Sequence, residues 1–178
     1  DIIFGDIPNP AQAINSKVRN SINGFPALLY INGKFQGVYN FNNDRYSSRI
    51  FGYTNPDKHI CYEISANTDS TAGAFFSYEE GESQGKTEQQ YYASDFMAIY
   101  PPTKVAGNDS FDKVKRLVEF VSSADGETFT ENLSNYFNKE YLLRYFIFVQ
   151  LFGLVDNLGK NMKIASWDGG NIWYIQPY

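Results

Sequence analysis

The hydrophobic pattern of this chain changes once, and that change limits the folds it can adopt. Before residue 104 the apolar residues fall in short runs bounded by turn residues, which is typical of strands. After it they recur about every 3.6 residues, as in helices. We therefore predict an α+β protein in two parts. The first, over 1–104, combines a helix with an antiparallel sheet, and the second, over 105–178, is mainly helical.

The first part should open with a helix and continue into a hairpin. Asn9 and Pro10 suit the cap and first position of a helix, and apolar residues at helical spacing follow as far as Gly24. Two apolar runs then flank Asn32-Gly33, the strongest short signal for a β-hairpin. Further strands are expected at three places: 60–65, 74–78 and 96–100.

Helices should dominate the second part. The first begins near Asp109, and Thr128 and Glu131 have the spacing of a capping box for the second. Asn138 can cap the third. The third helix, Tyr141 to Leu154, is apolar on nearly every side, so we expect it to be the central buried helix.

This third helix leads into a loop that carries Asp156 and Asn161, five residues apart, ahead of a predicted hairpin over 162–176. The spacing matches the catalytic loop of kinase-like phosphotransferases, where the Asp accepts the proton of the attacking hydroxyl and the Asn holds Mg²⁺. An acid and a hard oxygen ligand are what such chemistry requires. The run 156–159, Asp-Asn-Leu-Gly, is also a good helix-ending turn, so the spacing alone leaves both interpretations open.

Composition excludes several other kinds of site. The chain has one cysteine, Cys61, and one histidine, His59, so an intrachain disulfide, a cysteine-based zinc site and a His-rich metal site are impossible. A net charge of −5 without a Lys/Arg cluster argues against nucleic acid as a partner. The longest apolar run, 141–155, contains two polar residues and is too short to span a bilayer.

Two separated stretches resemble the CotH family. They are YINGKFQGVYNFNNDR, from Tyr30, and YFIFVQLFGLVDNLGKNMKIASWDGGNIWYIQPY, from Tyr145. The family consists of atypical, kinase-like proteins first known from bacterial spore coats, with related domains in surface proteins and phage structural proteins. The resemblance covers most of 25–178.

The resemblance implies a protein-kinase-like fold, in which a sheet lobe precedes a helical lobe that ends in a β-hairpin, with ATP and Mg²⁺ between the lobes. It implies a catalytic-like loop over 155–161. Within it, Asp156 corresponds to the catalytic-loop Asp and Asn161 to the metal-binding Asn. Lys160 is placed to neutralise a transferring phosphoryl group.

The same resemblance indicates where the chain departs from the family. The family continues after Tyr178 with an Asp-x-Asp motif that supplies the second metal ligand, so we expect a truncated fragment that is inactive alone. A phosphate-binding Lys is expected near the end of the third strand, where the sequence reads Cys61-Tyr62-Glu63. Its usual Glu partner is replaced by Asn43, so neither member of the pair can be named.

Two functions of different classes follow. The first is ATP- and Mg²⁺-dependent phosphoryl transfer to a protein hydroxyl, performed in the full-length parent. The second is a catalytically inactive structural or interaction module of a virion, spore coat or cell surface. The missing Lys–Glu signature favours the second, as do the 14 Tyr and 15 Phe residues. Carbohydrate binding has only the aromatic content in its favour.

Both functions imply a protein partner or substrate and membership of a larger protein or assembly. An extracellular, spore-coat or virion location is implied by the resemblance alone.

Overall fold

The computed structural model of this chain describes residues 10–13, 16–19, 21–64, 75, 92–93, 96–101 and 110–177. It contains helices together with two sheets whose strands all pair in antiparallel fashion. The predicted α+β class with antiparallel sheets is therefore confirmed.

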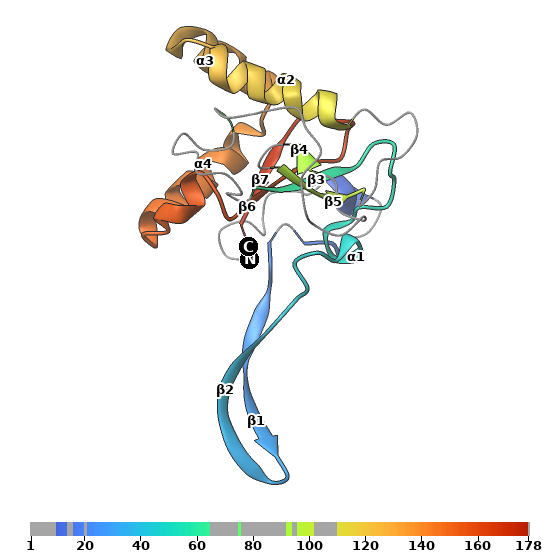
Figure 1. The fold of residues 1–178 in the computed structure, drawn as a ribbon, viewed down its shortest axis with the longest axis vertical. Coiled ribbons are helices and arrows are strands. Elements are labelled where there is room, and N and C mark those ends of the chain that lie inside the picture. Colours follow the sequence, from blue (N-terminus) through green and yellow to red (C-terminus); the bar gives the residue numbers. More distant parts are fainter. Residues whose placement is uncertain are drawn as a thin grey trace.

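A five-stranded sheet lies at the centre of the body (Figure 1). Its strands, in spatial order, are β4 (Tyr92–Ala93), β5 (Phe96–Tyr100), β3 (Ile60–Ile64), β6 (Met162–Ser166) and β7 (Tyr174–Gln176). The strands predicted at 60–65 and 96–100 and the hairpin predicted over 162–176 are present. The strand predicted at 74–78 lies outside the described residues, apart from Phe75. Since β3 pairs with β6, the sheet joins residues from both sides of position 104, and the division into two lobes stays a prediction.

Helices pack on one face of this sheet and form the main core. They are α2 (Ser110–Ser123), α3 (Gly126–Asn132) and α4 (Lys139–Leu151), with a short 3₁₀ turn, η2 (Leu133–Asn135), after α3. Leu117 of α2 and Tyr145 of α4 meet Tyr62 of β3 in one buried cluster. Burying such side chains contributes roughly 1.5–3 kcal/mol each, so this cluster is a main source of stability.

Side chains on the opposite face of the sheet form a second cluster. Strand residues alternate between faces, so Cys61 points away from Tyr62 and packs with Ala165 and Trp167. The short helix α1 (Ser48–Phe51) closes this side with Phe51. The sheet is therefore covered on both faces.

The helix predicted from Pro10 to Gly24 is wrong. Among the described residues of this stretch, only Pro10–Ala13 form a 3₁₀ turn, η1; 16–19 and 21–23 are not helical, and Gly24 begins a strand. Ala11 and Val18 are instead buried against α1, where the Arg19 amide donates to the Ile50 carbonyl at 2.8 Å. The apolar residues whose spacing suggested a helix are therefore buried by contacts with a distant segment of the chain.

The capping box predicted at Thr128 is also wrong. The N-cap of α3 is Asp125, whose carboxylate accepts a hydrogen bond from the Thr128 amide at 2.8 Å, so Thr128 lies inside the helix. Hydrogen bonds from Thr128 lower the pKa of the Asp125 carboxyl group. The cap predicted at Asn138 is confirmed, because its side chain accepts from the Tyr141 amide at 2.9 Å.

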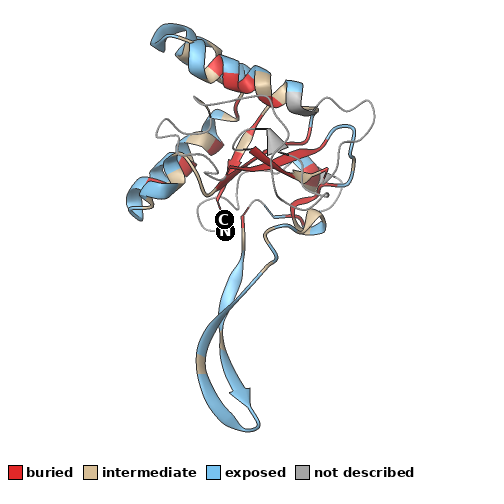
Figure 2. Ribbon diagram, in the orientation of Figure 1, coloured by how far each residue is buried: buried red, intermediate tan, exposed pale blue. Residues whose placement is uncertain are grey.

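The composition of α4 predicts burial on nearly every side, but the structure buries only one side of the helix. Tyr141, Tyr145 and Val149 are buried against the sheet. The opposite side carries four apolar side chains that are 51–70% exposed, namely Leu143, Phe146, Ile147 and Leu151 (Figure 2). One face of the helix meets the core, and nothing among the described residues covers the other. No described helix is long and apolar enough to cross a membrane.

A two-stranded arm projects from the body (Figure 1). It consists of β1 (Gly24–Ile31) and β2 (Lys34–Asn42), and it confirms the hairpin predicted around Asn32-Gly33. Both turn residues have positive φ, 50° and 77°, which is the geometry of the tight turn that favours Asn-Gly. Most of the arm is exposed (Figure 2).

Candidate functional site

The loop that follows α4 carries the three predicted site residues. It contains a 3₁₀ turn, η3 (Val155–Leu158), which includes Asp156, and then Gly159, Lys160 and Asn161 before β6 begins. Asn161 has φ of 53°, a left-handed conformation that Asn adopts more readily than most residues. The backbone therefore turns sharply where the loop enters the sheet.

Hydrogen bonds anchor this loop to the buried side of α4. The Tyr145 hydroxyl donates to the Asn157 carbonyl at 2.8 Å, and the Asn157 amide group donates to the Asn161 carbonyl at 2.7 Å. Burial raises the pKa of Tyr145 to about 12, so its hydroxyl keeps the proton that it donates. The core thus fixes the backbone between Asp156 and Asn161.

Asp156 and Lys160 form an ion pair at the surface of the loop. The Lys160 Nζ lies 3.6 Å from the Asp156 Oδ1, and the two side chains are 42% and 65% exposed. Such a pair contributes about 0–1 kcal/mol to stability. The carboxylate is therefore open to solvent, with a positive charge beside it.

The side chains of this loop fit a magnesium ion only when other ligands share it. The described residues contain no group of three or more His, Cys, Asp or Glu side chains placed to hold a metal. Asp156 and Asn161 nevertheless offer hard oxygen donors, and Mg²⁺ is commonly held by one or two side chains together with water and substrate phosphates. The donor set therefore suits Mg²⁺ bound to a nucleotide, and does not suit a metal cage made by the protein alone.

The sequence motif of the loop does not include a buried charge cluster formed by Arg45, Glu63 and Lys163. Lys163 of β6 lies directly opposite Glu63 of β3, and the two residues are 1% and 4% exposed. The Lys163 Nζ donates to the Arg45 carbonyl, and the Arg45 guanidinium lies 3.7 Å from the Glu63 carboxylate. Burial lowers the pKa of Lys163, and the nearby Glu63 charge acts against that shift.

This cluster stands where the resemblance expects a phosphate-binding Lys. The third strand supplies an acid, Glu63, and the cation comes from β6, about 100 positions later. The available signal was a single charged residue inside each of two apolar strands, ICYEI and MKIAS. A charged residue in a buried strand indicates that an oppositely charged partner lies nearby. It cannot identify that partner, because β3 and β6 pair although they are far apart in the sequence.

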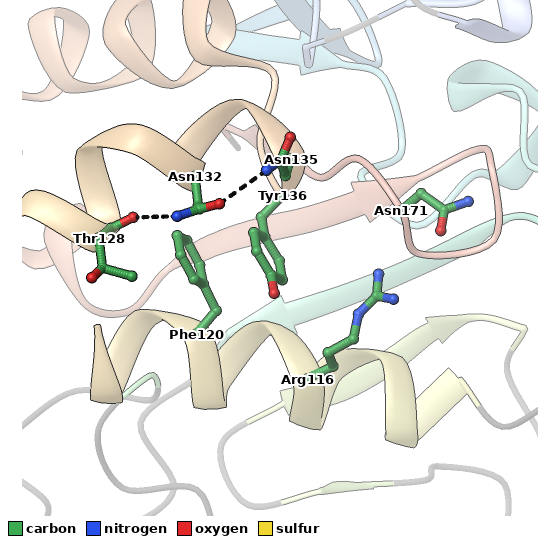
Figure 3. Close-up of a pocket in the computed structure, with 7 residues that line it drawn as sticks. All are labelled: Arg116, Phe120, Thr128, Asn132, Asn135, Tyr136 and Asn171. Carbon is green, nitrogen blue, oxygen red and sulfur yellow. Dashed lines mark hydrogen bonds between the residues drawn. The ribbon is translucent and has the colours of Figure 1, made fainter. Parts of the chain in front are cut away.

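A cavity of about 420 Å³ lies away from the predicted site residues, between α2, the α3–η2 segment and the turn before β7 (Figure 3). Its lining includes Arg116, which donates to the Gly170 carbonyl at 3.0 Å, and the rings of Phe120 and Tyr136, stacked with centroids 3.9 Å apart. Asp156, Lys160 and Asn161 do not line it. These side-chain contacts pack α2 against the α3–η2 segment and the turn.

The family model described as CotH kinase protein matches residues 20–178. The match includes the arm, the five-stranded sheet and the loop with Asp156 and Asn161. No curated protein and no solved structure matches the chain.

Proposed function

The chain belongs to the CotH kinase family, and from that premise we propose that it performs phosphoryl transfer from ATP, with Mg²⁺, to a protein hydroxyl within its full-length parent. One observation carries the proposal. The loop 155–161 holds an exposed carboxylate, a cation 3.6 Å from it and an amide oxygen donor, on a backbone fixed to the core by Tyr145.

Each residue has a role that its position supports. The Asp156 carboxylate accepts the proton of the substrate hydroxyl while the hydroxyl oxygen attacks the γ-phosphorus, and the bond from that phosphorus to ADP breaks. The Lys160 ammonium lies beside this carboxylate and offsets negative charge on the transferring group. Asn161 offers an oxygen ligand to Mg²⁺, which when bound would neutralise charge on the phosphates.

Labelled ATP tests this proposal on the full-length parent protein. Asp156→Ala should lower phosphoryl transfer by about 10²-fold or more, since a positioned general base contributes about 10²–10⁴-fold. Asp57→Ala is the matched control, because Asp57 is also an exposed acid but lies outside the loop. Removal of Mg²⁺ by a chelator should abolish transfer in every variant. If Asp156→Ala transfers label as well as the parent protein, the role assigned to Asp156 is wrong.

A second candidate function is a catalytically inactive interaction module of a virion, spore coat or cell surface. It is favoured by the apolar side chains that the arm and α4 leave exposed, which suit contacts with protein. Titration of the full-length protein with ATP and Mg²⁺ separates the two functions. Binding in the micromolar range supports the phosphotransferase, and no binding at millimolar nucleotide supports the module.

A further inference from the structure

The outer surface of the arm is more apolar than water-exposed strands usually are. Register pairs Leu28 with Val38 and Tyr30 with Phe35, which places these four side chains on one face of the hairpin. All four are 55–65% exposed. We call this face the arm patch. An isolated two-stranded hairpin is at best marginally stable in water, so an arm of this composition needs a partner surface.

The opposite face of the arm is also lined by apolar side chains. The Phe25 and Phe41 rings lie 5.4 Å apart, and the Tyr39 ring lies close to Gly37. Leu29 on this face is only 37% exposed. The other large apolar side chains of this face are exposed as well, at 52–64%. The arm patch differs from it in having no charged residue, because Lys34 pairs with Ile31 on the opposite face.

A second apolar surface lies on the same molecule. Leu143, Phe146, Ile147 and Leu151 form one stripe along α4, on the side away from the sheet, and each is at least half exposed. We call it the helix patch. The 13 residues of α4 extend about 20 Å, and the strands of the arm extend about 27–30 Å, so the arm can cover the whole stripe.

We propose that the chain forms a two-fold dimer in which the arm patch of each copy packs on the helix patch of the other. The arm runs away from its own body (Figure 1), and the Asn43 amide closes its base by donating to the Asn23 carbonyl at 2.9 Å. A second copy can therefore meet the arm without any change in the arm's direction.

The exposed area is sufficient for a stable dimer. Each of the eight side chains in one arm–helix contact presents on the order of 100 Å² of apolar surface. One contact thus buries about 800 Å², and the two-fold axis repeats it. A total near 1,600 Å² equals the standard size of a specific protein interface.

Charge is compatible with this arrangement. Lys34, at the tip, is the one Lys, Arg, Asp or Glu in the arm sequence 24–42. The two ends of the helix patch each have an exposed carboxylate nearby, Glu140 and Asp156, with side chains 64% and 65% exposed. Each carboxylate is already paired within its own chain, Glu140 with Arg144 at 2.7 Å and Asp156 with Lys160 at 3.6 Å. Charge therefore neither favours nor opposes the docked arm.

Sedimentation velocity between about 5 and 200 µM tests the proposal, since specific dimers of this size have affinities of micromolar or better. The unsubstituted chain of 178 residues should reach twice its 20.3 kDa mass. Val38→Lys and Ile147→Glu should each raise the dimer Kd by at least about tenfold, because each buries a lone charge in the contact. Tyr39→Lys, on the other face of the arm, is the matched control and should leave the dimer intact.

Mixing the two weakened variants gives the decisive measurement. In a mixed dimer, one contact keeps the parent arm and helix patches, and the other brings the new lysine to the new glutamate. Dimers should therefore return when Val38→Lys and Ile147→Glu chains are combined. Circular dichroism confirms that each variant keeps its fold.

Three results would overturn the proposal. They are an unsubstituted chain that remains monomeric across the range, variants that dimerise as tightly as that chain, and a mixture of the two variants that stays monomeric. The last result would mean that arms pair with arms, or that the arm folds onto its own body.

Discussion

Replacing Lys163 by Met should destabilise the protein by about 3 kcal/mol, and neutralising Glu63 as well should recover much of that loss. Lys163 is 1% exposed and lies opposite Glu63, which is 4% exposed. Removing one member of a buried ion pair typically costs about 3–5 kcal/mol, because the other charge stays buried. Arg45 remains 3.7 Å from Glu63 and is itself 41% exposed, so we expect the lower end of that range.

The shape of the substituted side chain supports the same estimate. Lys163 Nζ lies 4.8 Å from the centre of the Phe51 ring and 5.5 Å from that of Tyr46. Met retains most of the apolar stem of Lys, so little packing is lost and the change is mainly one of charge. The double variant Lys163→Met with Glu63→Gln removes both charges and should be about 2 kcal/mol more stable than Lys163→Met alone.

Urea unfolding followed by tryptophan fluorescence measures these differences. Trp167 and Trp173 are 6% and 1% exposed, and they lie in the two separate core clusters, so both faces of the sheet are monitored. Lys58→Met is the control at an exposed lysine and should stay within about 0.5 kcal/mol of the parent. A loss of unfolding free energy for Lys163→Met as small as that for Lys58→Met would contradict this prediction. So would a double variant that is the least stable protein of the set.

Further predictions concern the second core cluster and the glycines. Burial raises the pKa of Cys61 from 9.0 to about 11, so the thiol ionises at lower pH in the unfolded chain than in the folded one. The stability that this group contributes is therefore fully present below pH 9 and is lost as the pH rises to 11. Relative to Cys61→Ala, the parent should therefore lose up to about 3 kcal/mol over that interval in urea unfolding, and its thiol should resist labelling at neutral pH. Gly52→Ala should cost about 2–4 kcal/mol in the same assay, because φ is +74° and the new Cβ would lie 2.4 Å from the Ala11 Cβ. Gly33→Ala, with φ of +77° and no atom within 4 Å of its Cβ, should cost only the backbone term of about 1–2 kcal/mol, and equal losses at the two glycines would contradict this.

Features set by neighbouring residues were predictable from the sequence. The Asn32-Gly33 turn depends on two residues that tolerate positive φ, and the Asn138 cap depends on one side chain and an amide three positions later. The strands at β3 and β5 follow from short apolar runs. The loop with Asp156, Lys160 and Asn161 also lies where the spacing put it, between α4 and β6, while the roles of these residues stay predictions.

Features set by contacts between distant segments were not predictable. Ala11 and Val18 had the spacing of a helix, but they are buried because α1 covers them. The composition of α4 indicated burial on every side, but only contacts in space decide which sides are covered. Glu63 and Lys163 meet because β3 pairs with β6, and no local pattern in either strand determines that pairing.

The exposed face of α4 connects the two proposals. Leu151, the last residue of α4 and part of the helix patch, is only five positions before Asp156. A copy docked on the helix patch would therefore lie beside the candidate catalytic loop, and dimerisation would limit which hydroxyl groups reach Asp156. In the full-length parent, phosphoryl transfer to an added protein should then change when Val38→Lys weakens the dimer, while the Asp156–Lys160 pair itself is unaltered. If Val38→Lys changes the oligomeric state but not the rate of transfer, the two surfaces act independently and the loop is accessible in both states.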